Sequence, residues 1–408
     1  MLSLTAWLAA ANLAQLALGL VQSIVLARWL GPAGWGELGW VLSAIMVADA
    51  VAQAGLPNIL VREVAASPRD DGGTFGTAVA LRGALAAAGA LVLWPVAGPW
   101  AGLLLLAYVG QLGGLVLRAK LSRGPQIAAN LLPITLSTAA VAAVAARRAP
   151  ETSLALAVLA LAGLIAGVGQ LLLARASLVG RPGWNPGRAR ILLREAWPLW
   201  AGAILVAWMY RLDVFLLKYL LPPGEAGLAL GYYQTAYKPV ESGNFLLGAL
   251  VMTAFPAFSA AARTGRSAGI LRRAVRDVLA QARVLGAMAV LGAVVLGPWA
   301  IRLLFGTSYA PSGVAVQLLS PALLFVLLNS LLASLLTATG RQRELLWVTA
   351  AMVAFKLAAN LVAIPVWSYR GSAAATTLTE GFGLVLLWWR CRAAGLTGPV
   401  PRRVESGL

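Results

Sequence analysis

The chain has 408 residues, of which 60% are hydrophobic and only 11% are charged. About a quarter of the residues in a soluble domain are charged, so this composition excludes a soluble globular protein and predicts a polytopic membrane protein. The net charge of +18 does not indicate a partner nucleic acid, because the basic residues lie mainly in short loops between apolar segments. The single cysteine, Cys391, excludes an internal disulfide framework. Without histidine, any proton transfer must use carboxylates.

Twelve apolar segments long enough to cross a bilayer follow one another along the chain. The first has no basic stretch before it and no small-residue cleavage site after it, so we interpret it as a membrane span rather than a signal peptide. Several segments are rich in alanine and glycine, which permits close packing of helices in lipid. The predicted spans are 4–27, 36–57, 74–94, 100–118, 127–146, 153–174, 196–221, 226–258, 281–301, 313–338, 344–366 and 371–390.

The basic residues of the loops predict the orientation of these spans. They concentrate in one set of alternate loops, which places that set and both termini in the cytoplasm. The arginine-rich segments 179–195 and 260–283 belong to this set, and the second is spaced like a basic amphipathic helix on anionic lipid. The opposite set holds only Arg28, Arg147, Arg148, Lys218, Arg302 and Arg370.

A polar linker midway along the chain predicts two halves. They are an N-terminal six-helix bundle (1–178) and a C-terminal six-helix bundle (196–392), with a cytoplasmic linker (179–195) and a cytoplasmic tail (393–408). The stretches LARWLGPAGWGELGW and LLKYLLPPGEAGLALGYY share a basic residue, a proline and glycine break and a glycine that opens the next helix. We expect two repeats related by an axis along the membrane normal, with a central cavity between them.

Eight ionisable residues lie inside the predicted spans. A charge near the bilayer centre costs roughly 2.5–3.5 kcal/mol, so these side chains must largely face one another or water. The hairpin 197–259, which breaks at Pro222, Pro223 and Gly224, carries four of them. The bases are Arg82, Arg211, Lys238 and Lys356, and the acids are Asp49, Asp213, Glu241 and Glu380.

The four bases are candidate ligands for an anion. We interpret Arg211, Lys238 and Lys356 as cavity cations, because several cations at one depth indicate an anionic substrate. Arg82 either faces the same cavity or extends to the cytoplasmic surface. Lys238 and Glu241 share a helix face at i,i+3 spacing, so a structural ion pair is the alternative for these two.

The four acids are candidate cavity or coupling-ion carboxylates. Asp213 lies two residues, or about 200° round a helix, from Arg211, so we assign it to a neighbouring helix. Asp49 and Glu380 are either coupling-ion carboxylates or interhelical hydrogen-bond partners. Glu241 either lies in the cavity together with Lys238 or forms the structural ion pair with it.

Several stretches carry a resemblance to a known family. They are LARWLGPAGWGELGW with GLPNILVREVA, YRLDVFLLKYL with GYYQTAYKPVESGNFLLGALVMTAFPAFS, FGTSYAPSGVAVQLLSPALLFVLLNSLLASLLTATGRQRE, and NLVAIPVWSYRGSAAATTLTE. In this order they resemble bacterial polysaccharide-biosynthesis membrane proteins. These are the oligosaccharide-lipid flippases of the multidrug/oligosaccharidyl-lipid/polysaccharide (MOP) exporter superfamily.

The resemblance implies a function. It is translocation of an undecaprenyl-pyrophosphate-linked oligosaccharide from the cytoplasmic to the outer leaflet of the bacterial cytoplasmic membrane, for cell-surface polysaccharide biosynthesis. It also implies alternating access driven by a proton or sodium gradient, no bound cofactor, and polysaccharide polymerase and glycosyltransferases as further partners. Arg211, Asp213, Lys238 and Glu380 stand where such flippases carry cavity charges.

Three other functions remain as alternatives. A drug exporter of the same superfamily generally handles cations with an acidic cavity, whereas here four bases balance four acids. A lipid II flippase typically has fourteen spans rather than twelve. A membrane glycosyltransferase or polymerase usually needs a sizeable extramembrane loop with paired carboxylates or an acidic metal-binding motif. The loops here are short and contain only Asp70, Asp71 and isolated acids, so we predict that the chain is not an enzyme.

Overall fold

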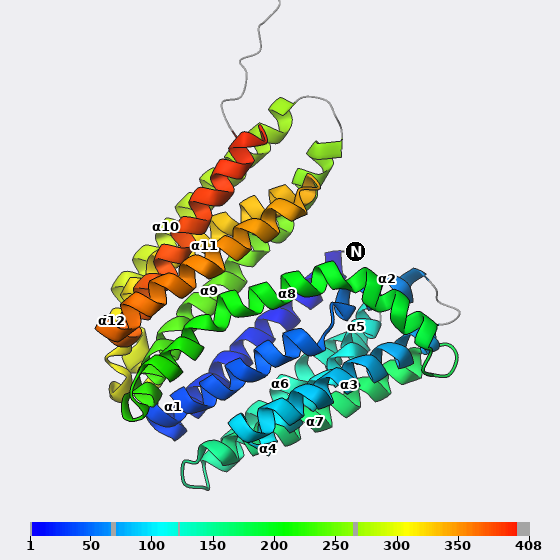
Figure 1. Ribbon diagram of the computed structural model, residues 1–408, viewed down its shortest axis with the longest axis horizontal. Coiled ribbons are helices and arrows are strands. Elements are labelled where there is room, and N and C mark those ends of the chain that lie inside the picture. The colour runs from blue at the N-terminus through cyan, green and yellow to red at the C-terminus, as the bar shows by residue number, and fades with distance from the viewer. Residues whose placement is uncertain (1, 67–70, 121–122, 264–267, 398–408) are drawn as a thin grey trace, which may run out of the picture. The chain divides into compact units, whose positions relative to one another are not determined.

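The computed structural model describes residues 2–66, 71–120, 123–263 and 268–397, and within them every regular element is a helix (Figure 1). Most of the predicted tail, from 398 onward, lies outside the described residues. The helices are α1 (Leu2–Ala52), α2 (Leu56–Ala66), α3 (Asp71–Ala97), α4 (Pro99–Ala107), η1 (Tyr108–Gly110), α5 (Gln111–Ala119), α6 (Arg123–Ala145), α7 (Thr152–Ser177), α8 (Pro186–Leu220), α9 (Pro223–Arg263), α10 (Ala268–Phe305), η2 (Thr307–Tyr309), α11 (Ser312–Ala338) and α12 (Gln342–Ala393).

All twelve predicted spans lie on these helices. Helices α1 and α12 each contain two predicted spans that meet at a kink, and α4, η1 and α5 together make up one span. In the part of the chain that the structure describes, nine helical stretches are long and apolar enough to cross a membrane. The predicted fold class, an all-α polytopic membrane protein, is therefore confirmed.

Glycine followed by proline starts a new helical segment at two places. Gly31 has φ 69° and ψ 173° inside α1, a conformation that glycine adopts without steric cost, and Pro32 follows it. Gly98 (φ 78°) precedes Pro99, the first residue of α4. Proline suits this position because its missing N–H would have no helical partner there. The predicted break at 222–224 has the same chemistry, since α9 begins at Pro223.

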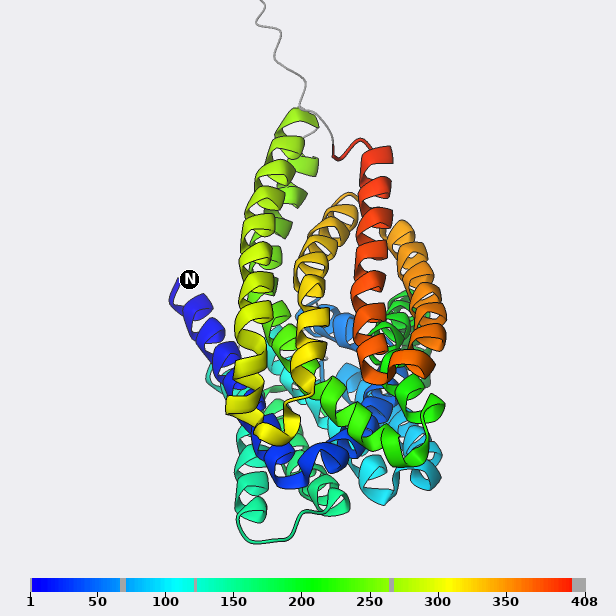
Figure 2. The ribbon, with the colours of Figure 1, turned by 90° about the vertical axis from the view of Figure 1, so that its left-hand side faces the viewer.

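Helix α12 bends back on itself. Its kink is at Ser368 (φ 52°, ψ −135°), between the predicted spans 344–366 and 371–390. Figure 2 shows the two halves, orange and red, meeting at the kink and running side by side in opposite directions. The break that the sequence predicts here is confirmed.

Two predicted segments differ from the structure near the ends of spans. The predicted span 36–57 ends earlier, at Ala52, and the short helix α2 follows. Arg62, which was expected in a loop, lies on α2 and pairs with Glu63 and Glu195. The stretch 260–283 was expected to hold a separate surface helix, but from Ala268 it continues into the apolar part of α10 as one helix (Figure 2).

The contacts divide the chain into two compact units, Met1–Val214 and Phe215–Leu408, here called the N-terminal and C-terminal units. The division falls within α8, which begins at Pro186, so part of the predicted linker 179–195 is helical. Leu192 and Ala196 are buried against Leu56 and Ile59 of α2, which fixes the first turns of α8 to the N-terminal unit. The predicted domain limits at 178 and 196 stay a prediction.

Small residues allow close helix packing in the N-terminal unit, as expected from the composition. A Cβ atom added at Gly110 would lie 2.2 Å from the Cα atom of Gly167 on α7. A Cβ atom at Gly113 would lie 2.3 Å from the carbonyl oxygen of Gln170. Since real Cβ atoms do not approach so closely, η1 and α5 can pack against α7 in this way only with glycine at these positions.

Helix α11 is the centre of the C-terminal unit. It contacts α9, α10 and α12, and Leu319, Leu335 and Leu336 on it are fully buried. An apolar helix buried on several sides is typical of the interior of a membrane bundle. The intramembrane charges of this unit are placed around α11.

Candidate functional site

The N-terminal unit contains a buried ion pair between α1 and α3. Arg82 Nη2 donates a hydrogen bond of 2.9 Å to Asp49 Oδ1, and the Arg82 side chain is only 1% exposed. The same nitrogen lies 3.3 Å from Gln111 Oε1, at the start of α5. Asp49 also accepts a hydrogen bond of 2.6 Å from Gln53 Nε2, one turn further along α1. These contacts join three helices at one buried polar point, here called the Asp49–Arg82 cluster.

Burial separates the two alternatives for Arg82. The residue lies near the middle of the 27-residue helix α3 and points into the unit. It does not extend to the membrane surface. Its Nε atom is buried and has no hydrogen-bond partner, although an unsatisfied buried donor costs about 1–3 kcal/mol. The cluster therefore keeps one donor that a rearranged state or a ligand could use.

Arg211 and Asp213 are close in sequence but have different environments, as the helix geometry predicts. Arg211 is partly exposed, and its Nε lies 3.0 Å from Met46 Sδ on α1. Asp213 is 1% exposed, and its Oδ1 accepts a hydrogen bond of 2.9 Å from the Val214 N–H. The Tyr108 hydroxyl is within electrostatic range of Arg211 and of Asp49. Arg211 and Asp49 are therefore both near the Tyr108 hydroxyl.

The C-terminal unit contains a second buried polar cluster, between α11 and α12. Asn329 Nδ2 donates to Glu380 Oε2 at 2.9 Å and to the Glu380 carbonyl oxygen at 3.0 Å. Lys356 is 1% exposed and close enough to Glu380 to act on it electrostatically. Asn360, one turn after Lys356, donates to the Lys356 carbonyl oxygen at 2.8 Å. We call this group the Glu380–Lys356 cluster.

Lys238 and Glu241 form the i,i+3 pair that the sequence predicts. Lys238 Nζ lies 2.8 Å from Glu241 Oε2, and the two side chains are 27% and 43% exposed. On the same helix, the Tyr233 hydroxyl is buried and lies 3.0 Å from Thr376 Oγ1 of α12. The Lys238–Glu241 pair is therefore much more accessible than either buried cluster.

The structure brings some of the predicted residues together and separates others. Asp49 and Arg82 meet within the N-terminal unit, Glu380 and Lys356 within the C-terminal unit, and Lys238 and Glu241 on α9. The interhelical hydrogen bonding that was one alternative for Asp49 and for Glu380 is present. The roles of all eight residues in binding substrate or a coupling ion stay predictions.

The sequence interpretation missed the amides that complete the two buried clusters: Gln53, Gln111, Asn329 and Asn360. Two of them had a signal, because Gln53 and Asn360 each follow a charged residue by one helical turn, which places both side chains on one face. Gln111 and Asn329 are far in sequence from their partners. Only the packing of the helices reveals their contact.

These features define the class of the protein. Helical stretches that can cross a membrane, arranged in two units that each contain a buried cluster of acid, base and amide, make it a multi-pass membrane protein. Over residues 2–262 the chain matches the family described as polysaccharide biosynthesis protein, and it belongs to that family. The family predicted from the resemblance is thus confirmed. The comparison with curated proteins found no match.

Solved structures with the same fold are transporters of the MOP superfamily. An inward-facing multidrug resistance transporter of its MATE family has a TM-score of 0.71 at 16% identity, over 95% of this chain and 98% of that chain. The lipid II flippase MurJ, in an inward closed conformation, has a TM-score of 0.74 at 11% identity, over 95% of this chain and 88% of that chain. A MOP superfamily transporter from Pyrococcus furiosus, described as having a binding pocket of reverse polarity, has a TM-score of 0.66 at 15% identity, over 96% of both chains. At these identities the likeness shows the fold.

Proposed function

We propose that the protein is a flippase that moves an undecaprenyl-pyrophosphate-linked oligosaccharide from the cytoplasmic to the outer leaflet of the bacterial cytoplasmic membrane. Membership of the polysaccharide biosynthesis family and the MOP fold support a lipid-linked substrate. The bias of arginines toward alternate loops supports cytoplasmic termini. Polysaccharide polymerase and glycosyltransferases, which act on the same lipid-linked glycan, are the proposed partners.

The contrast in burial among the intramembrane cations carries this proposal. Arg82 and Lys356 are each 1% exposed and lie against Asp49 and Glu380 of their own units. Arg211 and Lys238 are partly exposed, although they lie in the predicted spans 196–221 and 226–258. A partly accessible guanidinium or ammonium at such a position suits a pyrophosphate, whose charged oxygens accept hydrogen bonds from either group. We therefore propose Arg211 in the N-terminal unit and Lys238 in the C-terminal unit, each by itself, as candidate pyrophosphate ligands, and assign Arg82 and Lys356 to the stability of the buried clusters.

We propose further that a proton or sodium gradient drives transport. Asp49 and Glu380 are carboxylates buried at 7% and 8% exposure, each with an amide donor beside it. A cation that binds either carboxylate would compete with the neighbouring base, and so change how the surrounding helices pack. Transport into proteoliposomes under an imposed proton or sodium gradient tests this coupling.

A thermal-shift titration of the purified full-length protein in detergent tests the proposed substrate. The ligands are an undecaprenyl-pyrophosphate-linked oligosaccharide, undecaprenyl monophosphate and a lipophilic cationic drug. A ligand present at a hundred times its Kd stabilises the native state by about 2.7 kcal/mol. We expect the largest shift with the pyrophosphate lipid, and its loss in Arg211→Gln and Lys238→Gln.

Arg302→Gln is the matched control, because Arg302 is an exposed arginine in the last turn of α10. Equal shifts with the pyrophosphate lipid in wild type, Arg211→Gln and Lys238→Gln would overturn the assignment of these residues. Stabilisation by the cationic drug alone would favour the drug exporter. That second candidate is supported by the fold it shares with the multidrug transporter.

A further inference from the structure

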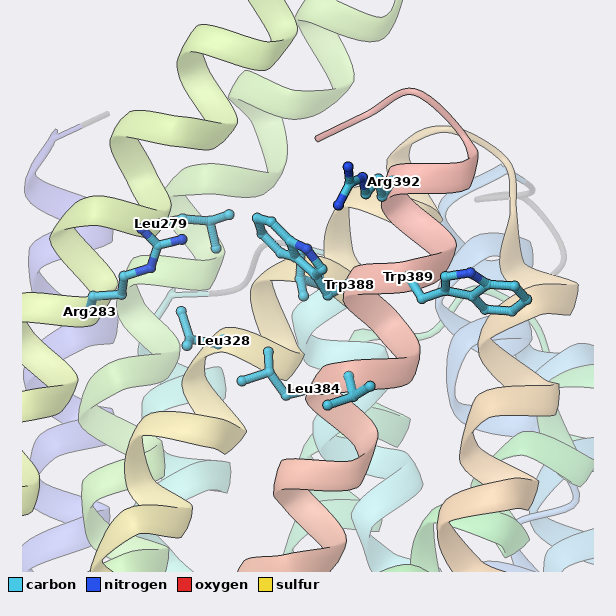
Figure 3. A pocket seen from close by; sticks show the side chains of 9 residues that line it. Leu279, Arg283, Leu328, Leu384, Trp388, Trp389 and Arg392 are labelled. Carbon is cyan, nitrogen blue, oxygen red and sulfur yellow. The ribbon is translucent and has the colours of Figure 1, made fainter. Parts of the chain in front are cut away.

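The C-terminal unit has a groove on its surface that the proposed transport function does not use. It lies where α10 and α12 flank the central helix α11, and it encloses about 410 Å³ (Figure 3). All of its lining residues come from this unit. A volume of this size is at the lower end of the range for small-molecule sites in proteins.

The floor and walls of the groove are apolar. Leu328 and Leu332 of α11 are buried beneath it, Leu279 of α10 forms one wall, and Leu384 and Trp388 of α12 form the other. The groove opens outward, since Val385 at its edge is 66% exposed. An apolar channel open along a spanning helix suits a hydrocarbon chain that lies along the unit.

One end of the groove is strongly basic. Arg283 on α10 and Arg392 near the end of α12 both line it, and both are exposed. Figure 3 shows them on opposite sides of the groove, with the Trp388 indole between them. Tryptophan and arginine together are typical of the depth at which lipid headgroups begin. The groove thus passes from an apolar body to a cationic mouth.

The mouth is held in place by other contacts. Arg272 Nε on α10 donates a hydrogen bond of 3.0 Å to the carbonyl oxygen of Gly395, just after α12 ends. Cys391 is buried, and its Sγ lies 3.9 Å from the carbonyl oxygen of Leu332 on the floor of the groove. The two walls are therefore fixed beside Arg283 and Arg392 without a ligand, which lowers the cost of ordering a bound lipid.

We propose that this groove binds an anionic glycerophospholipid of the membrane leaflet at which α12 ends. Its phosphate lies between Arg283 and Arg392, and one acyl chain lies over Leu328 and Leu332. Basic pockets between spanning helices are suited to such headgroups. Two guanidinium groups exceed the single charge of a phosphodiester, so they favour an anionic lipid and repel the ammonium group of a zwitterionic one. The proposal does not depend on which substrate the protein transports.

Thermal unfolding of the full-length protein in non-ionic detergent tests the site. Phosphatidylglycerol, phosphatidylcholine and undecaprenyl monophosphate are each titrated, so no transported glycan is involved. We expect phosphatidylglycerol to stabilise the wild type at lower concentration than the other two lipids. In Arg283→Gln/Arg392→Gln its affinity should fall roughly tenfold or more, because two charge-assisted contacts are lost.

Two further variants separate the parts of the site. Arg273→Gln/Arg276→Gln removes the same charge from exposed positions on α10 and should leave the phosphatidylglycerol affinity unchanged. Leu384→Trp fills the groove but keeps both arginines, and should weaken binding of phosphatidylglycerol at least as much as the double arginine variant does. The Leu384→Trp variant also tests the site if the double arginine variant fails to fold.

Three results would overturn the proposal. Equal loss of affinity in the two double arginine variants would show diffuse electrostatic attraction rather than a site. Unchanged affinity in Leu384→Trp would show that no acyl chain enters the groove. Tighter binding of undecaprenyl monophosphate than of phosphatidylglycerol would assign the groove to a polyprenyl chain instead.

Discussion

The buried ion pair of the N-terminal unit can be tested by removing one charge and then both. Asp49→Asn leaves the Arg82 guanidinium, 1% exposed, beside neutral amide oxygens and without the negative charge of Asp49, and its Nε is still without a partner. Arg82→Gln leaves the Asp49 carboxylate with only the Gln53 amide among the contacts described above. Each single variant therefore leaves one buried charge without its counter-charge. In the double variant, both residues are neutral.

The expected magnitudes follow from the burial of the pair. Removing one partner of a buried salt bridge costs about 3–5 kcal/mol, most of which is the penalty of the charge left behind. Because an amide remains beside each charge, we expect about 3 kcal/mol for each single variant. The double variant Asp49→Asn/Arg82→Gln should lose far less than the sum, which gives a coupling energy of about 2–3 kcal/mol.

Equilibrium unfolding in mixed detergent micelles, followed by circular dichroism, measures these free energies. Arg62→Gln is the control, because Arg62 also pairs with carboxylates but its side chain is 55% exposed, and exposed pairs contribute little. Additive losses in the double variant would refute the idea that the two charges stabilise one another. A loss from Arg62→Gln as large as that from Arg82→Gln would refute burial as the cause.

Two further predictions concern the stability of each unit. Asn329→Leu removes the donor from the buried Glu380 carboxylate and should lower the free energy of unfolding by about 1–3 kcal/mol; thermal unfolding checks it, and an unchanged midpoint would contradict it. Gly110→Ala places a Cβ atom 2.2 Å from the Cα atom of Gly167 and should destabilise by about 1–3 kcal/mol through overpacking. Gly83→Ala is its control, because no atom lies within 4 Å of the added Cβ; equal effects of the two glycine substitutions would refute close packing as the reason.

The two buried clusters use the same chemistry in different ways. In the N-terminal unit the base donates directly to the acid, at 2.9 Å. In the C-terminal unit the amide of Asn329 makes the direct contact, and Lys356 acts on Glu380 electrostatically. In each of the two clusters, the buried acid therefore lies near a base of the same unit. This balance explains how so many ionisable residues can be inserted into an apolar bundle.

Local patterns in the sequence were sufficient for the fold class and for most helix breaks. Apolar length indicated the spans, and the glycine and proline at 31–32 and 98–99 marked where new helical segments begin. Two helices extend beyond the predicted spans through arginine-rich segments. Helix α8 starts at Pro186 and α10 at Ala268, because an arginine-rich segment has no intrinsic reason to stop a helix.

The sequence alone determined that this protein crosses the membrane, where most of its helices break and which charged residues lie within its predicted spans. These properties depend on composition and on contacts between neighbours in the chain. Only the tertiary structure decided that Arg82 reaches Asp49 and Gln111, and that Asn329 reaches Glu380. The partners come from different helices, and the packing of small residues sets which helix faces meet. No spacing along one chain can specify that choice.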